Sequence, residues 1–303
     1  MCRLRRSIGP NSSKFVMDKK IIATLRCTAC HSSFREQSGE IVCSGCVQTF
    51  AVEGGKIFFI SPPGDSPAPA VDDARDRDRW TDWRKSNYQF LYSELNRIDR
   101  SSVLLDLGVG NAPFRDLTDS FAVRIAADFS PHPNVNVVCN LLNPLPFQDN
   151  TFDVVIASNV LEHIPDARTV LLEARRVLRP GGRFVATIPF LMRMHQRPYD
   201  FHRYTDLMLM RMFQEAGFHQ SSIKPLGTSF DVYQHIGQHF FSLMFDRSDD
   251  MNHAARRFAW WWAVRLSWWA HRVLMAVCWP VFRRAPVTPD FTEGYGCVAV
   301  KEL

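Results

Sequence analysis

Short apolar segments alternate with stretches of helical periodicity over most of the chain. Helical spacing is clearest over residues 167–178, and a further helix is expected over 80–99. Four segments rich in Val, Ile and Phe have the length and composition of buried strands, namely residues 103–108, 123–129, 152–158 and 183–189. Alternating strands and helices predict an α/β fold built on a doubly wound, mostly parallel sheet.

Other segments fall outside this pattern and divide the chain into parts. We expect a basic, disordered tail over residues 1–20, a small cysteine-containing module over 21–60, and an extended linker rich in proline over 61–79. The alternating domain then occupies 80–303. No apolar stretch follows the charged N-terminus, so no signal peptide is expected and a cytoplasmic protein is predicted. Met1 and Met17 both remain candidate starts.

Charge changes the picture of the partners. The 303 residues carry a formal net charge of +5, which alone would suggest nucleic acid or a membrane surface. Residues 1–20 carry +5, residues 251–289 carry +6, and the remainder carries −6. A mildly acidic body argues against nucleic acid as a partner. The hydrophobic content of 46% excludes a disordered or fibrous chain.

Four of the eight cysteines form two pairs with metal-ligand spacing. Cys27 and Cys30 are separated by two residues, as are Cys43 and Cys46, and twelve residues lie between the pairs. Two such turns complete a tetrahedral set of thiolates, which leaves no open coordination position and predicts a structural zinc ion. The alternative is four unrelated core cysteines.

A glycine-containing turn follows the first buried strand. Asp106, Gly108 and Gly110 lie where the chain leaves this strand, and Asp128 closes the next strand twenty residues after Gly108. Glycines allow a backbone to approach a ligand closely, and a carboxylate in that place can accept both hydroxyls of an adenosine ribose. A dinucleotide site would need a third glycine where Pro113 stands, so a pyrophosphate site is not expected.

With these residues the chain resembles the class I S-adenosylmethionine (SAM) methyltransferases, especially the type 11 group. The segments 141–166 and 173–184 match characteristic stretches of that group, and the likeness covers residues 80–227 and the final strand. It implies a Rossmann-like sheet with an antiparallel last strand and SAM as cofactor. The cofactor-binding residues that it implies are Asp106, Gly108, Gly110, Asp128, Phe129, Asn140, Leu141 and Asn159.

Two positions depart from the family pattern. Ala112 stands at the third glycine, and Asn140 stands where an acid often contacts the adenine amino group. An amide oxygen can still accept from that amino group, but a role in capping the loop stays open for Asn140. For the glycine turn and Asp128, the alternative is a purely structural role, in which the glycines shape the turn and Asp128 caps a helix or is solvated at the strand end.

The acceptor side is expected beyond the carboxyl ends of the strands. His163, after the third predicted strand, is a candidate general base, and the alternative is that it packs or caps its loop. The loop 188–205 resembles a loop of bacterial type 11 enzymes linked with cell-surface saccharide and lipid pathways. Its candidate substrate contacts are His195, Tyr199, Asp200, His202 and Arg203. Alternatively, Asp200 and Arg203 form an ion pair that anchors the loop over Tyr204.

A helical insertion is expected at about residues 228–290, before the final strand. Six of the eight tryptophans lie between Trp260 and Trp279. The longest stretch between arginines in this segment is ten residues, too short for a membrane span. Arginines on one arc of an otherwise apolar helix predict peripheral membrane contact through 256–283. Packing on the domain or in a homodimer is the alternative.

The function expected from these features is SAM-dependent methyl transfer to a small or amphipathic acceptor, such as a lipid, a quinone precursor or a lipid-linked saccharide. The enzyme would be cytoplasmic, with attachment to the inner membrane. The module over 21–60 resembles zinc ribbons of the Trm112 type. Such a ribbon could bind a partner, a substrate or the neighbouring domain, and the sequence does not decide among these three. The alternatives are an RNA or protein methyltransferase that docks through this ribbon, and an inactive methyltransferase-like binding protein.

Overall fold

The computed structural model describes residues 18–60, 80–246, 254–282 and 284–303. The expected linker and residues 1–17 of the expected tail lie outside this part. Helix α1 (Lys19–Thr24) begins within the segment predicted to be a disordered tail. The Asp18 side chain caps it by accepting a hydrogen bond from the Lys20 N–H, so ordered structure starts two residues earlier than expected.

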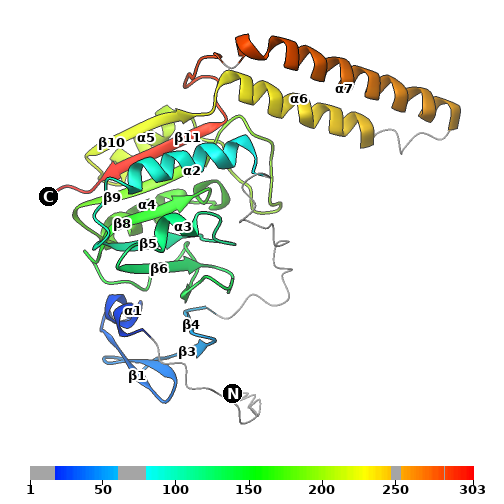
Figure 1. Ribbon diagram of the computed structural model, residues 1–303. Helices are drawn as coiled ribbons and strands as arrows, with labels where there is room; N and C mark the ends of the chain where they lie inside the picture. Colours follow the sequence, from blue (N-terminus) through cyan, green and yellow to red (C-terminus); the bar gives the residue numbers. More distant parts are fainter. Residues whose placement is uncertain (1–17, 61–79, 247–253, 283) are drawn as a thin grey trace.

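A twisted sheet runs through the whole molecule (Figure 1). Its central strands lie in the order β7-β6-β5-β8-β9-β11-β10. The first five of these are parallel, and β11 pairs antiparallel with both β9 and β10. This confirms the predicted mixed α/β, Rossmann-like fold with an antiparallel last strand. The bounds are β5 (Val103–Leu107), β6 (Val123–Asp128), β7 (Val137–Val138), β8 (Phe152–Ser158), β9 (Leu178–Pro189), β10 (Gln220–Leu226) and β11 (Gly294–Val300).

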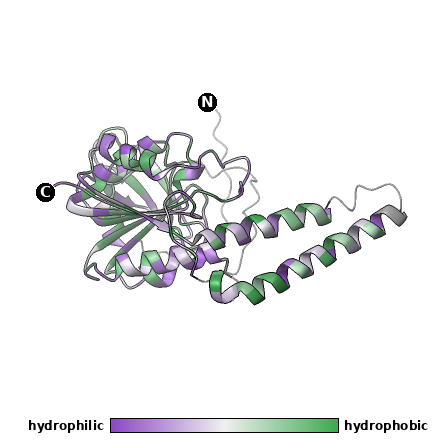
Figure 2. Cartoon of the chain, turned by 90° about the horizontal axis from the view of Figure 1, so that it is seen from above, coloured by the Kyte–Doolittle hydropathy of each residue, from purple (hydrophilic) through white to green (hydrophobic). Residues whose placement is uncertain are grey.

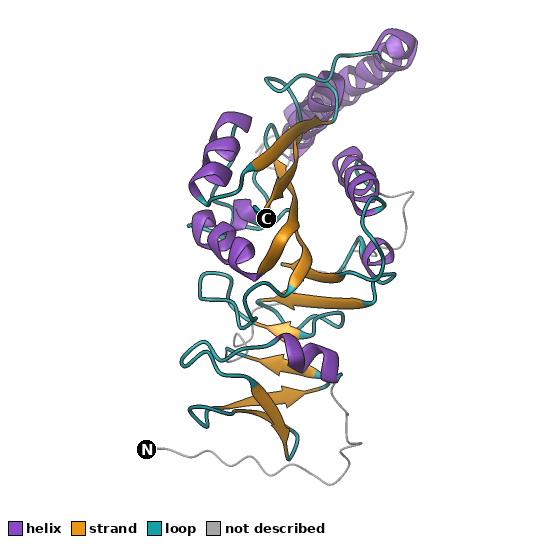
Figure 3. Cartoon of the chain, turned by 90° about the vertical axis from the view of Figure 1, so that its left-hand side faces the viewer, coloured by secondary structure: helices purple, strands orange, loops and turns teal. Residues whose placement is uncertain are grey.

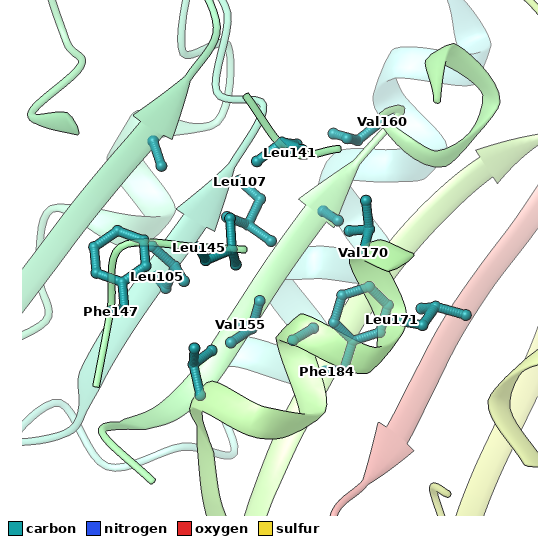
Figure 4. Close-up of a cluster of buried hydrophobic side chains, with 14 of the residues drawn as sticks. Leu105, Leu107, Leu141, Leu145, Phe147, Val155, Val160, Val170, Leu171 and Phe184 are labelled. Atoms are coloured by element: carbon teal, nitrogen blue, oxygen red, sulfur yellow. The ribbon is translucent and has the colours of Figure 1, made fainter. Parts of the chain in front are cut away.

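Helices cover both faces of this sheet (Figure 3). Helices α2 (Asp82–Leu95) and α3 (Arg115–Thr118) contact each other on one face, whereas α4 (Ala167–Val177) and α5 (Asp206–Glu215) contact each other on the opposite face. The alternation of buried side chains along β5 and β8 supplies a core to each layer. Figure 4 shows the α4 side, where Leu105, Val155, Val170, Leu171 and Phe184 pack together.

The cysteine module extends the sheet instead of forming a separate unit. Strands β1 (Phe34–Gln37), β2 (Glu40–Cys43), β3 (Thr49–Glu53) and β4 (Lys56–Phe58) form an antiparallel meander. Strand β4 pairs in parallel with β7, with Ile57 opposite Val137. The Arg26 guanidinium also lies 2.7 Å from the Asp149 carboxylate. Eleven strands within the described ranges therefore form one continuous sheet.

A helical hairpin stands between β10 and β11 and projects away from the sheet (Figures 1 and 2). It consists of α6 (Ser229–Asp246) and α7 (Ala254–Phe282). The Trp260 indole N–H donates to the Met244 carbonyl at 2.9 Å near the tip, and the Phe230 and Phe282 rings stack at the base. None of the described helices is both long and apolar enough to cross a membrane.

Candidate active site

The glycine turn after β5 takes the conformation expected of it. Gly108 and Gly110 have φ angles of +64° and +50°, values that residues with a Cβ rarely adopt. A Cβ on Gly108 would lie 2.6 Å from Cγ2 of Val160, so this glycine allows a close approach to the loop after β8. A Cβ on Gly110 would meet no atom within 4 Å, because the space above it is open.

Asp128 holds this turn from the end of β6. One carboxylate oxygen accepts the Gly110 N–H at 2.8 Å, and the other accepts the Ser130 N–H at 2.8 Å. Asp106 lies elsewhere: its carboxylate is 2.9 Å from the Arg124 guanidinium, and both side chains are largely buried. Burial raises the pKa of Asp106, and Arg124 opposes this rise. The structure thus joins Asp128 to the glycine turn and pairs Asp106 with an arginine.

The remaining predicted cofactor residues surround the same strand ends. Phe129 is 47% exposed and Leu141 is buried. The Asn140 side chain accepts the Leu142 N–H at 2.9 Å, the loop-capping geometry weighed above. Asn159, with a φ of +53°, accepts a hydrogen bond from the Trp83 indole N–H at 3.2 Å. This bond ties the start of α2 to the carboxyl end of β8.

His163 lies in a short 3-10 turn (Leu161–His163) directly after β8 and has two close titratable neighbours. Its ring contacts the His195 ring edge to face, with the centroids 4.9 Å apart, and its Nε2 is 3.6 Å from Oε1 of Glu162. Its Nδ1 is 2.5 Å from the Tyr199 carbonyl oxygen, so Nδ1 carries the proton and Nε2 keeps a lone pair. Burial lowers the pKa of His163, which favours this neutral form.

The loop after β9 is held by an ion pair. Arg203 donates to both carboxylate oxygens of Asp200, at 2.6 and 2.9 Å, and to the main-chain carbonyls of Met192, Arg193 and His202. Burial alone would raise the pKa of Asp200, but hydrogen bonds from Arg203 and from the His195 N–H lower it to about 2. The anchoring arrangement of Asp200 and Arg203 is therefore present, and Tyr204 is buried as expected.

Other candidates on this loop differ in accessibility. Tyr199 is 64% exposed, and His202 contacts the Pro165 carbonyl through Nε2 at 3.1 Å and stacks on Tyr204. His195, on the same loop, contacts the His163 ring, and its Nδ1 is 3.4 Å from an Asp200 oxygen. His195 and Tyr199 are thus the members nearest to both His163 and solvent.

Sequence analysis did not single out two buried glutamates that each have a carboxylate oxygen without a hydrogen-bond partner among the described residues. Glu162 is fully buried, and no group in the described part of the chain hydrogen-bonds either of its carboxylate oxygens. Burial raises its pKa to about 8. Glu293, just before β11, is 3% exposed, and burial together with Asp231 and Asp82 raises its pKa to about 8. For Glu162, its position next to His163 was the one sequence feature that could have identified it. For Glu293, no sequence feature indicated a buried position.

The four module cysteines come together as predicted. Their Sγ atoms all lie within 4.8 Å of one another, with 3.6 Å between Cys27 and Cys46 and 3.2 Å between Cys30 and Cys43. A tetrahedral zinc with Zn–S bonds of about 2.3 Å places its sulfurs about 3.8 Å apart. The arrangement of the four thiols is compatible with a zinc ribbon.

Comparison with known proteins agrees with this geometry. A family model described as a methyltransferase domain matches residues 105–186. The demethylmenaquinone methyltransferase of Corynebacterium urealyticum is 40% identical over 88 residues, which are 26% of this chain and 38% of the relative. An uncharacterised protein of Methanocaldococcus jannaschii is 26% identical over 175 residues, 52% of this chain and 83% of that protein.

Among solved structures, the SAM complex of phosphoethanolamine N-methyltransferase 2 from Haemonchus contortus is 15% identical, with a TM-score of 0.42, and covers 77% of this chain and 61% of its own. The chain spans about two fifths of the first of these curated relatives. The matched segment 105–186 contains the glycine turn, Asp128 and Glu162–His163. Residues 105–186 are therefore similar to a methyltransferase domain.

Proposed function

We propose that the protein is a SAM-dependent methyltransferase. The observation that carries the proposal is the pairing of Asp128 with the Gly110 N–H beneath an open space, at the carboxyl ends of β5 and β6. A ribose diol can bind the Asp128 carboxylate, and the cofactor can approach the backbone at Gly110 because no side chain stands there. Leu141, Phe129 and Asn159 border the same strand ends and complete the proposed pocket.

Bound SAM would supply an electrophilic methyl group on its sulfonium. In the proposed reaction, an electron pair of the acceptor would form the new bond to the methyl carbon as the carbon–sulfur bond breaks, and the acceptor would release a proton to solvent. The chain contributes mainly by holding donor and acceptor in line and excluding water. We place the acceptor next to the cluster of Glu162, His163 and His195, because this cluster follows Asn159 at the end of β8.

The proposed acceptor is a small or amphipathic molecule of the quinone-precursor type. The support is the name of the Corynebacterium urealyticum relative, whose 88 matched residues are 40% identical. The test is transfer of an isotopically labelled methyl group from SAM to demethylmenaquinone that has been chemically reduced to its quinol, in detergent micelles under anaerobic conditions, with Asp128→Ala as the control. Label in the quinone that depends on Asp128 supports the proposal. Label in RNA or protein substrates instead would favour a macromolecular methyltransferase, and no transfer to any of them would favour an inactive binding protein.

We also propose a structural zinc ion in the ribbon. Cys27, Cys30, Cys43 and Cys46 would hold it, since four thiolates close the coordination sphere. His31 and Val47, the residues directly after each cysteine pair, have φ angles of 62° and 60°. A β-branched residue in this left-handed region is strained, so its presence in Val47 supports a turn shaped around a ligand.

Finally, we propose that the hairpin attaches the enzyme to an anionic membrane surface. One face of α7 presents an exposed apolar stripe with spacings of three and four residues. Arg265 lies over the Trp261 ring at 4.4 Å, and Arg272 lies near Trp268. Arginines beside tryptophans at the edge of an apolar stripe suit lipid headgroups. The stripe consists of Phe258, Trp262, Leu266, Trp269, Val273 and Val277.

Co-sedimentation with vesicles that contain anionic phospholipid tests this attachment. Replacing Arg265 and Arg272 by Glu should abolish co-sedimentation, whereas replacing Lys85 and Arg211, which are exposed on α2 and α5, should not. If the protein does not co-sediment with vesicles but is a dimer in solution, the stripe instead contacts a second copy of the chain.

A further inference from the structure

Three potential metal ligands meet at the proposed acceptor side. The ligand atoms of Glu162, His163 and His195 all lie within 4.8 Å of one another. Glu162 and His163 follow β8, whereas His195 belongs to the loop after β9. Two adjacent parallel strands therefore deliver this cluster to one edge of the sheet, beside Asn159.

Each of the two imidazole rings has an oxygen atom close to its Nδ1. The Tyr199 carbonyl engages Nδ1 of His163, and the Asp200 carboxylate lies 3.4 Å from Nδ1 of His195. The Tyr199 hydrogen bond fixes the tautomer of His163 and leaves a lone pair on its Nε2, as such bonds do for histidines that bind metals. Asp200 places a negative charge beside His195 and accepts the His195 main-chain N–H at 2.6 Å. Arg203 would repel a cation, but Asp200 neutralises it through a bidentate pair.

The carboxylate lacks any such partner. Glu162 is fully buried, and neither its oxygens nor Nε2 of His163 has a hydrogen-bond partner within the described residues. These two unsatisfied groups are only 3.6 Å apart. A buried carboxylate without a partner is strongly unfavourable, and a cation between Glu162 and the imidazoles would satisfy all of them.

We propose that Glu162, His163 and His195 bind a divalent transition-metal ion, such as zinc. Two imidazoles and one carboxylate suit zinc or ferrous iron, whereas magnesium and calcium prefer oxygen ligands alone. Three protein ligands leave coordination positions for a further molecule. The side chains of His163 and His195 are 15% and 35% exposed, whereas Nε2 of His163 and both carboxylate oxygens of Glu162 are buried.

The function of this ion rests on the proposed methyltransferase activity. An acceptor hydroxyl bound to the ion loses its proton to solvent more readily. The deprotonated acceptor then forms the bond to the methyl carbon, the carbon–sulfur bond breaks, and neutral S-adenosylhomocysteine leaves. His163 acts in this case as a ligand and not as the general base.

Metal content per chain tests the site without any need for activity. Protein equilibrated with zinc and then freed of excess should hold about two ions per chain, one in the ribbon and one in the new site. Glu162→Gln and His195→Ala should each remove one ion, and Cys43→Ser should remove the other. His219→Ala, an exposed histidine of the β10 edge, is the matched control and should remove none.

Cobalt distinguishes the two sites. The ribbon should show thiolate-to-cobalt charge-transfer bands, and the second equivalent should add visible bands without them. Only one ion per chain in the folded wild-type protein would overturn the proposal, as would a second ion that persists in Glu162→Gln. Circular dichroism verifies that each variant is folded. SAM binding, measured separately by calorimetry, shows whether the proposed function fails independently.

Discussion

The main-chain N–H of Gly110 donates a hydrogen bond of 2.8 Å to the carboxylate of Asp128. This contact joins the ends of two neighbouring parallel strands, β5 and β6. It also fixes the carboxylate beside the open space above Gly110. Two features that lie eighteen residues apart in the sequence thus meet at one edge of the sheet, where we propose that SAM binds.

The two glycines of the turn should respond differently to an added methyl group. Gly108→Ala combines a left-handed conformation with a contact to Val160, and we expect a loss of about 2 to 5 kcal/mol in the free energy of unfolding. Gly110→Ala meets open space and should lose only about 1 to 2 kcal/mol. Urea unfolding measures both.

Gly110→Ala also tests whether SAM occupies the open space above Gly110. Gly110→Ala should weaken SAM binding at least about tenfold while the protein remains folded, because its Cβ enters the proposed pocket. Unchanged SAM affinity in folded Gly110→Ala would place the cofactor elsewhere.

Loss of the ribbon zinc should destabilise the whole chain. Cys27 and Ile41 of the ribbon belong to the same buried cluster as Leu105 and Phe147 of the central sheet. Cys43→Ser should therefore lower the Tm of a single transition by several degrees, whereas Cys278→Ser, on α7, should leave it unchanged. Two separate transitions, with the larger one unaffected, would show that the ribbon folds independently.

Stability should fall with rising pH because of Glu293. Its pKa is about 8 in the folded chain, against an ordinary value of 4.5, so the folded state retains a proton that the unfolded chain has released. The stabilisation is complete below about pH 4.5 and is lost as the pH rises through 8. Between about pH 6 and about pH 8.5 the wild type should lose about 2 kcal/mol more than Glu293→Gln. An equal loss of unfolding free energy in the two proteins between these pH values, measured by urea unfolding, would contradict this prediction.

Arg203 should be irreplaceable by lysine. Its guanidinium bridges both oxygens of Asp200 and three carbonyls of the loop, a pattern that one ammonium group cannot reproduce. Arg203→Lys should speed hydrogen exchange over residues 191–203 and reduce methyl transfer at least about tenfold, with SAM affinity unchanged. Arg211→Lys, an exposed arginine of α5, should change neither quantity. Normal exchange in Arg203→Lys would show that the ion pair does not hold the loop.

Strongly buried segments could be predicted from the sequence because burial leaves a local signal. Strands β5, β6 and β8 are mostly apolar, and each was expected within one residue of its observed bounds. The strand expected over residues 183–189 is longer than predicted. Strand β9 already begins at Leu178, because Leu178 pairs with Phe152 and an irregular register carries the chain through to Arg183.

Long-range contacts had no such signal. Strand β7 has only two residues, and nothing near Val137 indicates that it receives β4 of the ribbon. The burial of Glu162 depends on the distant loop, whose Phe201 and His202 N–H groups donate to the Glu162 carbonyl. The glycine turn and Asp128 could be predicted from the sequence because they lie close together along the chain. The burial of the Glu162 carboxylate beside His163 could not be predicted, because it depends on tertiary packing.

Isothermal calorimetry with SAM is the most direct test of the proposed cofactor site. Folded, zinc-loaded wild-type protein should bind one equivalent of SAM, and Asp128→Ala should lose at least about 2 kcal/mol of binding free energy, since the ribose hydroxyls lose a charged acceptor. Glu53→Ala, on ribbon strand β3, serves as the matched carboxylate control and should bind like the wild type. No heat of binding in the wild type, or equal affinity in Asp128→Ala, would contradict a SAM site at Gly110 and Asp128.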